Sequence, residues 1–325
     1  MFRDLVDHSL GCETNKRYTF DLHTIASLAR ERDQHIALTV GPNGIPKVLN
    51  LTAVIFHESR CGSTLAANVL IGMDPTRHRV YSESGPPASA LLGVCGESYT
   101  LCQPHQAALI VRDVLYLMSR SNDPLEERVF FKFQSVTTRS LPVFTMAYPN
   151  TPWLFVFREP VQVMMSHIRD GLQYANCVRS RSNPPQRIRD ILTRNHIRQV
   201  DAMTAEDYCA AHLASITESA VASFEDDKNG RGIPILYDTL IDTLVEDVLP
   251  HRLGVAVGDT ERGRIQQITS MYAKGRGSRA RHFSSDSEQK EKEASEACKQ
   301  AAATFLQESF DTLSSYVERQ KRIQS

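Results

Sequence analysis

Three segments of the sequence combine glycine, hydroxyl and basic residues in patterns that suit the binding of an anion. The first, Ser59-Arg60-Cys61-Gly62-Ser63-Thr64, lies between an apolar run at Leu51–His57 and an expected helix at Ser63–Met73. Backbone N–H groups at a helix start point toward a bound anion, and the glycine, hydroxyls and guanidinium allow close approach and add donors. The same residues also fit a plain turn with a Ser/Thr helix cap. The Gly-x-x-x-x-Gly-Lys-Ser/Thr pattern of nucleotide triphosphatases is absent.

The second segment pairs an arginine with a serine eight residues later. Arg158 ends a very apolar run at Trp153–Arg158, and Pro160 suits the first turn of a following helix. Ser166 then lies about two turns into that helix and can face the same side as the arginine. The pair could hold a phosphate, although a surface arginine followed by an unrelated helix serine is the plainer alternative.

The third segment, Lys274-Gly275-Arg276-Gly277 and the four residues after it, contains four cations and two glycines within eight positions. Glycine lets backbone amides approach a phosphate, and the cations neutralise it. A solvated flexible loop is the alternative. Residues 274–290 are polar and rich in Gly, Arg and Ser, so we expect a loop that is ordered mainly by what it binds.

The pattern of apolar residues indicates a fold that would bring these segments together. Short, nearly continuous apolar runs are typical of a parallel sheet covered on both faces, and helical patterns lie between them. The sequence therefore predicts a three-layer α/β fold, with ligands outside the carboxyl ends of the strands. The predicted strands are Leu51–His57, Val129–Phe133, Trp153–Arg158 and Ile233–Tyr237. The predicted helices are Ser63–Met73, His105–Arg120, Val161–Gln173 and Ala205–Phe224.

We expect a single domain over residues 1–325. Residues 1–50 would form an N-terminal extension containing a β-hairpin, with strands at 35–40 and 45–49 around a Gly-Pro-Asn-Gly turn. Residues 51–290 would form the core. A C-terminal helix over 291–325 would begin near Asp286 and end near Arg322.

Composition excludes several classes of protein. The net charge of -1 gives no global attraction to nucleic acid, and no run reaches the roughly 20 apolar residues of a membrane helix. The N-terminus lacks the apolar segment of a signal peptide. The 7 cysteines are odd in number, irregular in spacing and without a Cys-x-x-Cys pair, which argues against a disulfide framework and a zinc site. These features predict a cytoplasmic protein in a reducing compartment.

In this order, the anion-binding segments resemble those of sulfotransferases that use 3′-phosphoadenosine 5′-phosphosulfate (PAPS). In that family a loop such as Ser59–Thr64 holds the 5′-phosphosulfate, and an arginine and a serine spaced like Arg158 and Ser166 hold the 3′-phosphate. A late basic Gly loop, here Lys274–Gly277, covers the same phosphate. A Tyr-Asp/Glu-x-Leu element lines the nucleotide and matches Tyr237–Leu240.

The resemblance covers about residues 51–290 and implies a P-loop sulfotransferase fold. PAPS would be the cosubstrate, 3′,5′-ADP the product, and no metal would be required. Lys132 resembles the family lysine at the leaving oxygen, assisted by Arg60. Gln134 replaces the histidine base of the cytosolic branch, whereas Glu83 resembles the base of the tyrosylprotein and carbohydrate branches. His57 and His105 are the alternative bases, and Cys61 departs from the usual serine.

The acceptor would be a hydroxyl on a glycan, peptide or small metabolite. Seven arginines between positions 169 and 198 could collect an acidic acceptor, or could simply form a solvated basic helix. Two other functions stay open: a P-loop kinase of small molecules, and a non-catalytic nucleotide-binding protein of the same fold. The sequence does not indicate the oligomeric state.

Overall fold

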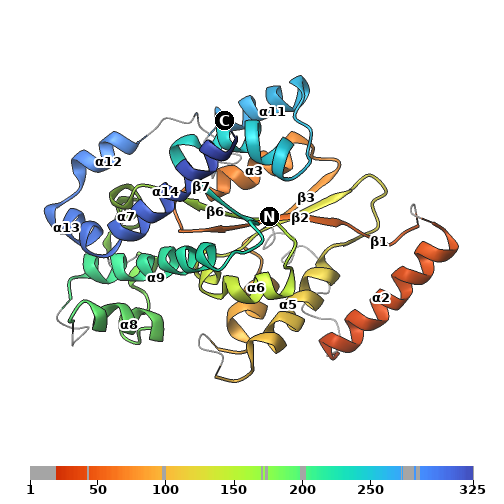
Figure 1. Cartoon of the computed structure of the whole chain (residues 1–325), viewed down its shortest axis with the longest axis horizontal. Coiled ribbons are helices and arrows are strands. Elements are labelled where there is room, and N and C mark those ends of the chain that lie inside the picture. The colour runs from red at the N-terminus through yellow and green to blue at the C-terminus, as the bar shows by residue number, and fades with distance from the viewer. Residues whose placement is uncertain are drawn as a thin grey trace, which may run out of the picture.

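The computed structural model describes residues 20–41, 44–96, 100–169, 171–172, 175–197, 203–271, 273, 282 and 286–324. Its centre is a five-stranded sheet with the order β3-β5-β2-β6-β7, in which every neighbouring pair is parallel (Figure 1). The predicted α/β fold with a central parallel sheet is therefore confirmed. The strands are β2 (Asn50–His57), β3 (His78–Ser82), β5 (Arg128–Lys132), β6 (Trp153–Phe157) and β7 (Gly232–Leu236).

Strand β3 is the one strand of this sheet that the sequence analysis missed. It lies at the sheet edge, pairs only with β5 among the described strands, and reads His-Arg-Val-Tyr-Ser. Because an edge strand is covered less completely than a central one, its side chains need not form a continuous apolar run. Only His78 of this strand is buried.

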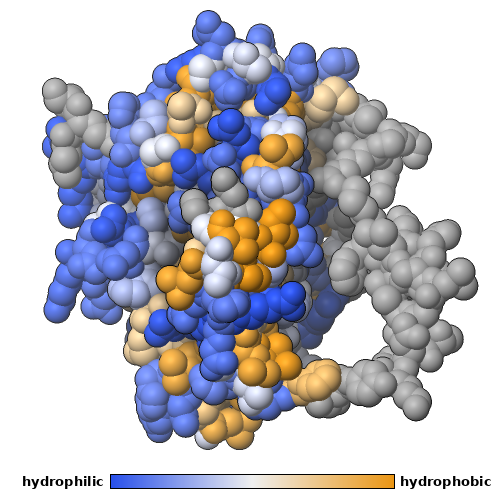
Figure 2. Space-filling view, turned by 90° about the vertical axis from the view of Figure 1, so that its right-hand side faces the viewer, coloured by the Kyte–Doolittle hydropathy of each residue, from blue (hydrophilic) through white to orange (hydrophobic). Residues whose placement is uncertain are grey.

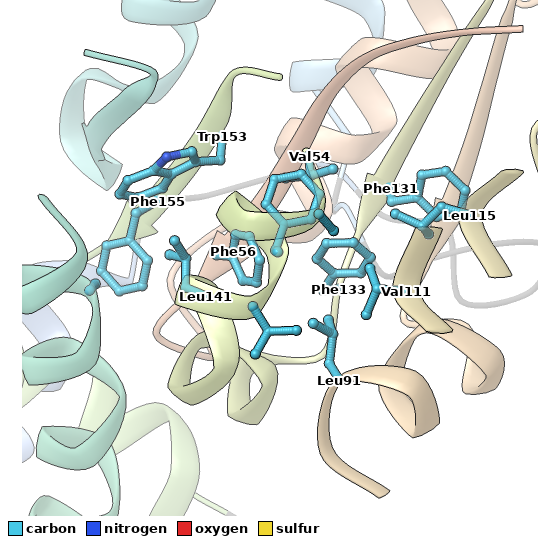
Figure 3. Close-up of a cluster of buried hydrophobic side chains, with 14 of the residues drawn as sticks. Val54, Phe56, Leu91, Val111, Leu115, Phe131, Phe133, Leu141, Trp153 and Phe155 are labelled. Carbon is cyan, nitrogen blue, oxygen red and sulfur yellow. The ribbon is translucent and has the colours of Figure 1, made fainter. Parts of the chain in front are cut away.

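Alternate side chains of the central strands enter two different cores. Val54 and Phe56 of β2 pack among aromatic residues on one face, which Figure 3 shows, whereas Ala53 and Ile55 face the opposite core. The first core is covered by α5 (Pro104–Met118), α6 (Leu141–Ala147), α9 (Ala205–Glu225) and α14 (Gln307–Gln324). The second is covered by α3 (Ser63–Met73), α11 (Asp259–Thr269) and the π-helical segment Thr243–Arg252. Burial on both faces explains why these strands are apolar at nearly every position.

The bounds of the observed helices can be compared with those that the apolar periodicity predicts. Helix α3 has the predicted bounds, and α7 ends five residues before the predicted Gln173. The helices are α2 (Leu22–Thr39), α3 (Ser63–Met73), α4 (Gly85–Ala88), α5 (Pro104–Met118), α6 (Leu141–Ala147), α7 (Pro160–Ile168), α8 (Gln186–Arg194), α9 (Ala205–Glu225), α10 (Leu240–Asp242), α11 (Asp259–Thr269), α12 (Ser287–Glu293), α13 (Glu296–Phe305) and α14 (Gln307–Gln324). Short 3₁₀ or π segments lie at Ser89–Gly93, Ser135–Ser140, Asn176–Val178, Tyr237–Thr239 and Thr243–Arg252.

The hairpin predicted over residues 35–49 is wrong. Residues up to Thr39 belong to α2, which begins after the cap residue Asp21. The short strand β1 (Lys47–Val48) pairs instead with β4 (Arg120–Ser121), far along the chain. Helix formation prevails because α2 packs on α5, and buried Asp33 accepts hydrogen bonds at 2.8 Å from Arg120 Nε and Nη2. Sequence alone did not reveal that partner.

The C-terminal region forms three successive helices rather than the single predicted one. Helix α12 ends at Glu293, and the hydroxyl of Ser295 then accepts a hydrogen bond from the N–H of Cys298 at 3.1 Å. This cap starts α13 in a new direction. Helices α13 and α14 pack against α9, which their own sequence pattern did not indicate.

Two disulfides contradict the expectation that the chain has no disulfide framework. Cys95 bonds to Cys102, and Cys177 bonds to Cys209 of α9, whereas Cys61 and Cys298 are buried free thiols. The inference of a reducing compartment therefore loses its basis, since structural disulfides persist in oxidising environments. Within the described part of the chain, no helix is both long and apolar enough to cross a membrane.

Helix α2 lies at the end of the sheet where the strands begin, whereas α7 and α12 lie where they end (Figure 1). Figure 2 shows the α2 side of the molecule, where apolar side chains interrupt the hydrophilic surface. Leu28 and Leu38 of α2 are exposed, and so is Val40 directly after it. The residues with candidate chemistry are at the other end of the sheet.

Candidate active site

Each of the five strands has a predicted binding or catalytic residue at or directly after its carboxyl end. These residues follow one another in the order of the strands in the sheet. Glu83 follows β3, Lys132 ends β5, the loop Ser59–Thr64 follows β2, Arg158 follows β6 and Tyr237 follows β7. Because the strands are parallel, all five positions lie at the same end of the sheet, where the strands finish. The loop is central, with the carboxylate and lysine on one side and the arginine and tyrosine on the other.

The backbone of the loop Ser59–Thr64 is left-handed at three of its six residues. Ser59, Arg60 and Gly62 have φ values of 89°, 55° and 88°. Gly62 leads directly into α3, and among the described residues no acceptor contacts its N–H or that of Thr64. A Cβ on Gly62 would lie 2.5 Å from the ring of Tyr237, so glycine is required by space as well as by φ. The local geometry is that of an anion cradle.

Two side chains of the loop attach it to β6 and α7. Arg60 Nε donates a hydrogen bond at 2.9 Å to the carbonyl of Ser166. The thiol of Cys61 donates at 3.0 Å to the carbonyl of Val156, and burial raises its pKa to about 12. Cys61 therefore stays a neutral thiol that holds the loop against β6, where serine had been expected from the resemblance.

Glu83 and Lys132 form an ion pair on one side of the loop. The lysine side chain is 1% exposed and the glutamate side chain 51% exposed, so a buried cation meets a carboxylate open to solvent. The N–H of Glu83 donates at 2.7 Å to the carbonyl of Lys132, which continues the β3–β5 pairing by one residue. Glu83 has φ 54°, a left-handed conformation that turns the chain directly after β3.

The two histidines considered as alternative bases differ in their surroundings. His57 Nδ1 accepts the N–H of Ser59 at 3.1 Å, which leaves Nε2 to donate to the carbonyl of Phe133 at 3.0 Å. Both ring nitrogens thus contact backbone groups, and Nε2 also lies 3.7 Å from Glu83 Oε1, beside the Glu83–Lys132 pair. His105 is exposed in the first turn of α5, and among the described residues no hydrogen bond or ion pair joins it to Glu83 or Lys132.

Arg158, on the other side of the loop, is buried and has several partners. Its Nε donates to Gln162 Oε1 at 2.7 Å and its Nη2 donates to Ser287 Oγ at 2.7 Å. Its Cζ lies 4.1 Å from the centroid of the Tyr237 ring, a cation–π contact. Gln162 and Ser166 are four residues apart and share one face of α7, and Arg158, which precedes the helix, reaches Gln162 on that face. The hydroxyl of Ser166 donates at 2.8 Å to the carbonyl of Gln162.

Sequence analysis missed a buried carboxyl group directly behind the loop. Glu58 is 1% exposed, and its Oε2 accepts the backbone N–H of Arg158 at 3.2 Å. Burial raises the pKa of Glu58 to about 8, which favours the neutral form at neutral pH. The position of Glu58, between an apolar strand and a glycine-containing loop, was the sequence feature that could have indicated it. Its protonation state depends on burial, which the sequence does not give.

The third anion-binding segment, Lys274–Gly277, lies outside the described residues. Its described neighbours are fixed near the site: the carbonyl of Ala273 accepts a hydrogen bond at 2.9 Å from Asn68 of α3. Met271 forms an isolated antiparallel bridge with His282. The chain thus enters this segment beside the helix that follows the central loop.

The basic region between positions 169 and 198 is only partly available as a cationic rim. A cavity of about 250 Å³ is lined by Arg187, Asp190, Ile191, Arg194 and Glu218, and contains none of the predicted site residues. Arg194 donates two hydrogen bonds to Glu218, at 2.7 and 2.9 Å. Within the described residues, no group of three or more His, Cys, Asp or Glu side chains could hold a metal ion.

Fold and site together define a three-layer α/β protein with a glycine-containing loop between its central strand and α3. Comparison with protein-family models and with curated proteins finds no match. Among solved structures, the chain is similar to the sulfotransferase domain of the Synechococcus PCC 7002 olefin synthase, with 12% identity, TM-score 0.43, and 81% of this chain and 97% of that one covered.

Two further solved structures show a similar likeness. A sulfotransferase from Mycobacterium tuberculosis H37Rv is 12% identical with a TM-score of 0.43, and the match covers 75% of both chains. A sulfotransferase from Alicyclobacillus acidocaldarius is 16% identical with a TM-score of 0.38, covering 66% of this chain and 85% of that one.

Proposed function

We propose that this protein is a PAPS-dependent sulfotransferase that acts on a hydroxyl group. The observation that carries the proposal is the order of residues along the sheet edge. The loop Ser59–Thr64 separates the Glu83–Lys132 pair from the Arg158–Tyr237 pair. A nucleotide with phosphate groups on the 3′ and 5′ positions of its ribose needs two anion sites, one on each side of an adenosine site. The acceptor must approach the sulfuryl group from the side beyond the 5′-phosphate.

The residues on the nucleotide side suit 3′-phosphoadenosine. Arg158 offers a fork of donors for the 3′-phosphate, and Gln162 and Ser166 lie on the same helix face. The amides of Gly62 and Thr64, together with Arg60, suit the 5′-phosphosulfate. Bound PAPS would supply an activated sulfuryl group whose leaving group is a phosphate.

The other pair suits the chemical step. The S–O bond to the phosphate breaks as a new S–O bond to the acceptor oxygen forms, and the hydroxyl loses its proton. Lys132 would neutralise the charge that grows on the leaving oxygen, and half-exposed Glu83 would accept the proton. Before the substrates bind, the two side chains contact each other as an ion pair.

Thermal-shift titration with 3′,5′-ADP, 5′-AMP and ATP plus Mg²⁺ tests the proposal. A sulfotransferase should be stabilised far more by 3′,5′-ADP than by 5′-AMP, because only the former fills the Arg158 site. A small-molecule kinase would respond best to ATP with Mg²⁺. If 3′,5′-ADP binds but labelled PAPS transfers to no hydroxyl acceptor in a screen of glycans, peptides and metabolites, the protein is a nucleotide-binding relative without catalysis.

A further inference from the structure

The start of α12 places an acidic and a basic residue against Arg158. Asp286 Oδ1 lies 3.6 Å from Arg158 Nη2, and Lys290 Nζ lies 2.8 Å from the same carboxylate oxygen. The lysine side chain is 13% exposed and that of Arg158 is 6% exposed, so both cations are largely removed from water. Asp286 is 41% exposed and has solvent on its outer side.

Two cations, Arg158 and Lys290, face this one carboxylate. Burial lowers the pKa of Lys290, and the charges of Arg158 and Arg169 lower it further, against the opposing effect of Asp286. Burial acts against ionisation of Asp286, but the hydrogen bond from Lys290 and the charges of Lys290 and Arg158 outweigh it and hold its pKa below the ordinary value. A single carboxylate therefore occupies a site with more positive charge than it can neutralise.

We propose that Lys290 is a further cation of the 3′-phosphate subsite, and that Asp286 is an internal counter-ion which the 3′-phosphate displaces. This inference rests on the proposed function, because it takes Arg158 to be a ligand of that phosphate. It adds two residues that the sequence motifs did not indicate.

The contacts around α12 support exchange of one anion for another. A phosphate carries more charge than a carboxylate and three acceptor oxygens, so it can accept from the Arg158 fork and the Lys290 ammonium together. Asp286 can turn into water because its side chain is partly exposed. Helix α12 can remain in place meanwhile, since Glu291 Oε1 accepts a hydrogen bond at 2.5 Å from Gln162 of α7.

The test compares the ratio of the Kd for 5′-AMP to the Kd for 3′,5′-ADP, which isolates the contribution of the 3′-phosphate. Lys290→Gln should lower this ratio about tenfold, as expected for loss of a charge-assisted hydrogen bond. Lys290→Arg should retain most of it. Asp286→Asn should raise the ratio by about three- to tenfold, because the phosphate no longer competes with a negative charge. Lys292→Gln and Glu288→Gln, both exposed on α12, are matched controls and should leave it unchanged.

The opposite signs expected for the two variants exclude a general disturbance of α12, which would lower the ratio in both. If Lys290→Gln and Asp286→Asn leave the ratio at the wild-type value, the inference is wrong while the proposed function stands. If the wild-type protein itself binds 5′-AMP as tightly as 3′,5′-ADP, the assignment of Arg158 fails, and the proposed function with it.

Discussion

Lys132 and Glu83 are 49 residues apart in the sequence, yet the buried ammonium of the first contacts the half-exposed carboxylate of the second. The contact follows from the pairing of β3 with β5, which aligns Ser82 with Lys132 and places Glu83 one residue beyond. Two adjacent strand ends thus supply the lysine that we propose for the leaving group and the carboxylate that we propose as the base.

Replacing Lys132 with methionine, which keeps the apolar stem, should lower turnover by about 10²-fold or more. The ammonium is expected to act where charge grows in the transition state, and loss of one such donor has effects of that size. The Kd for 3′,5′-ADP should change only a few-fold. Single-turnover kinetics with labelled PAPS measure the first quantity and calorimetry the second. If binding collapses but turnover of bound PAPS persists, Lys132 is a binding residue only.

Glu83→Gln should reduce turnover by about 10² to 10⁴ with 3′,5′-ADP affinity unchanged, since a general base contributes about that much. The loss should be smaller for an acidic phenol than for an alcohol, because the phenol needs less help to lose its proton. Comparing both acceptors on both proteins gives the answer. Near-normal turnover on the alcohol would refute the role of Glu83. His57, whose Nε2 lies 3.7 Å from Glu83 Oε1, would then be the next position to change.

Gly62→Ala should destabilise the protein by about 1–3 kcal/mol and weaken 3′,5′-ADP binding. A side chain at φ 88° is strained, and its Cβ would lie 2.5 Å from the Tyr237 ring, which must then move away from Arg158. Gly263→Ala in α11 is the control, because its Cβ would have no atom within 4 Å. That change should stabilise the protein by roughly 0.5–1 kcal/mol. Urea unfolding measures both.

Glu58 should make the protein less stable as the pH rises. Its pKa is raised from 4.5 to about 8 in the folded protein, so between these values the folded state holds a proton that the unfolded state has lost. Stability therefore falls with pH across this window, by at most about 5 kcal/mol. Glu58→Gln should remove this contribution. Urea unfolding at pH 5.5, 7 and 8.5 should show the variant gaining on the wild type as pH increases, and parallel curves would contradict the raised pKa.

The Cys177–Cys209 disulfide should stabilise the protein by up to about 3–4 kcal/mol, the chain-entropy value for its sequence separation of 32 residues. The double variant with serine at both positions should lose that stability. Reducing agent should lower the Tm of the wild type, whereas for the variant any shift should come only from the remaining disulfide. Peptide mapping without reduction checks the pairing directly. Recovery of alkylated Cys177 and Cys209 from the untreated protein would show that the bond does not form.

Local patterns in the sequence determined much of the architecture. The continuous apolar runs predicted four of the five strands of the central sheet, because a strand buried on both faces must be apolar along its length. The bounds of α3 followed from a run of helix-compatible residues directly after Gly62. These features depend on residues close together in the chain, so they can be predicted without knowledge of the partners. The assignment of Arg158, Ser166 and the loop to phosphate groups stays a prediction, although the fold places them at one edge.

Only the tertiary structure decided which distant residues meet. The edge strand β3, the pairing of Glu83 with Lys132 and the docking of Asp286 on Arg158 all depend on strand order and helix packing. No local sequence pattern predicts these contacts, since the same polar and charged residues are equally common in solvent-exposed loops. The bonding of Cys177 to Cys209 has the same origin: their spacing is irregular, and it is the packing of the chain after α7 against α9 that brings the two sulfur atoms together.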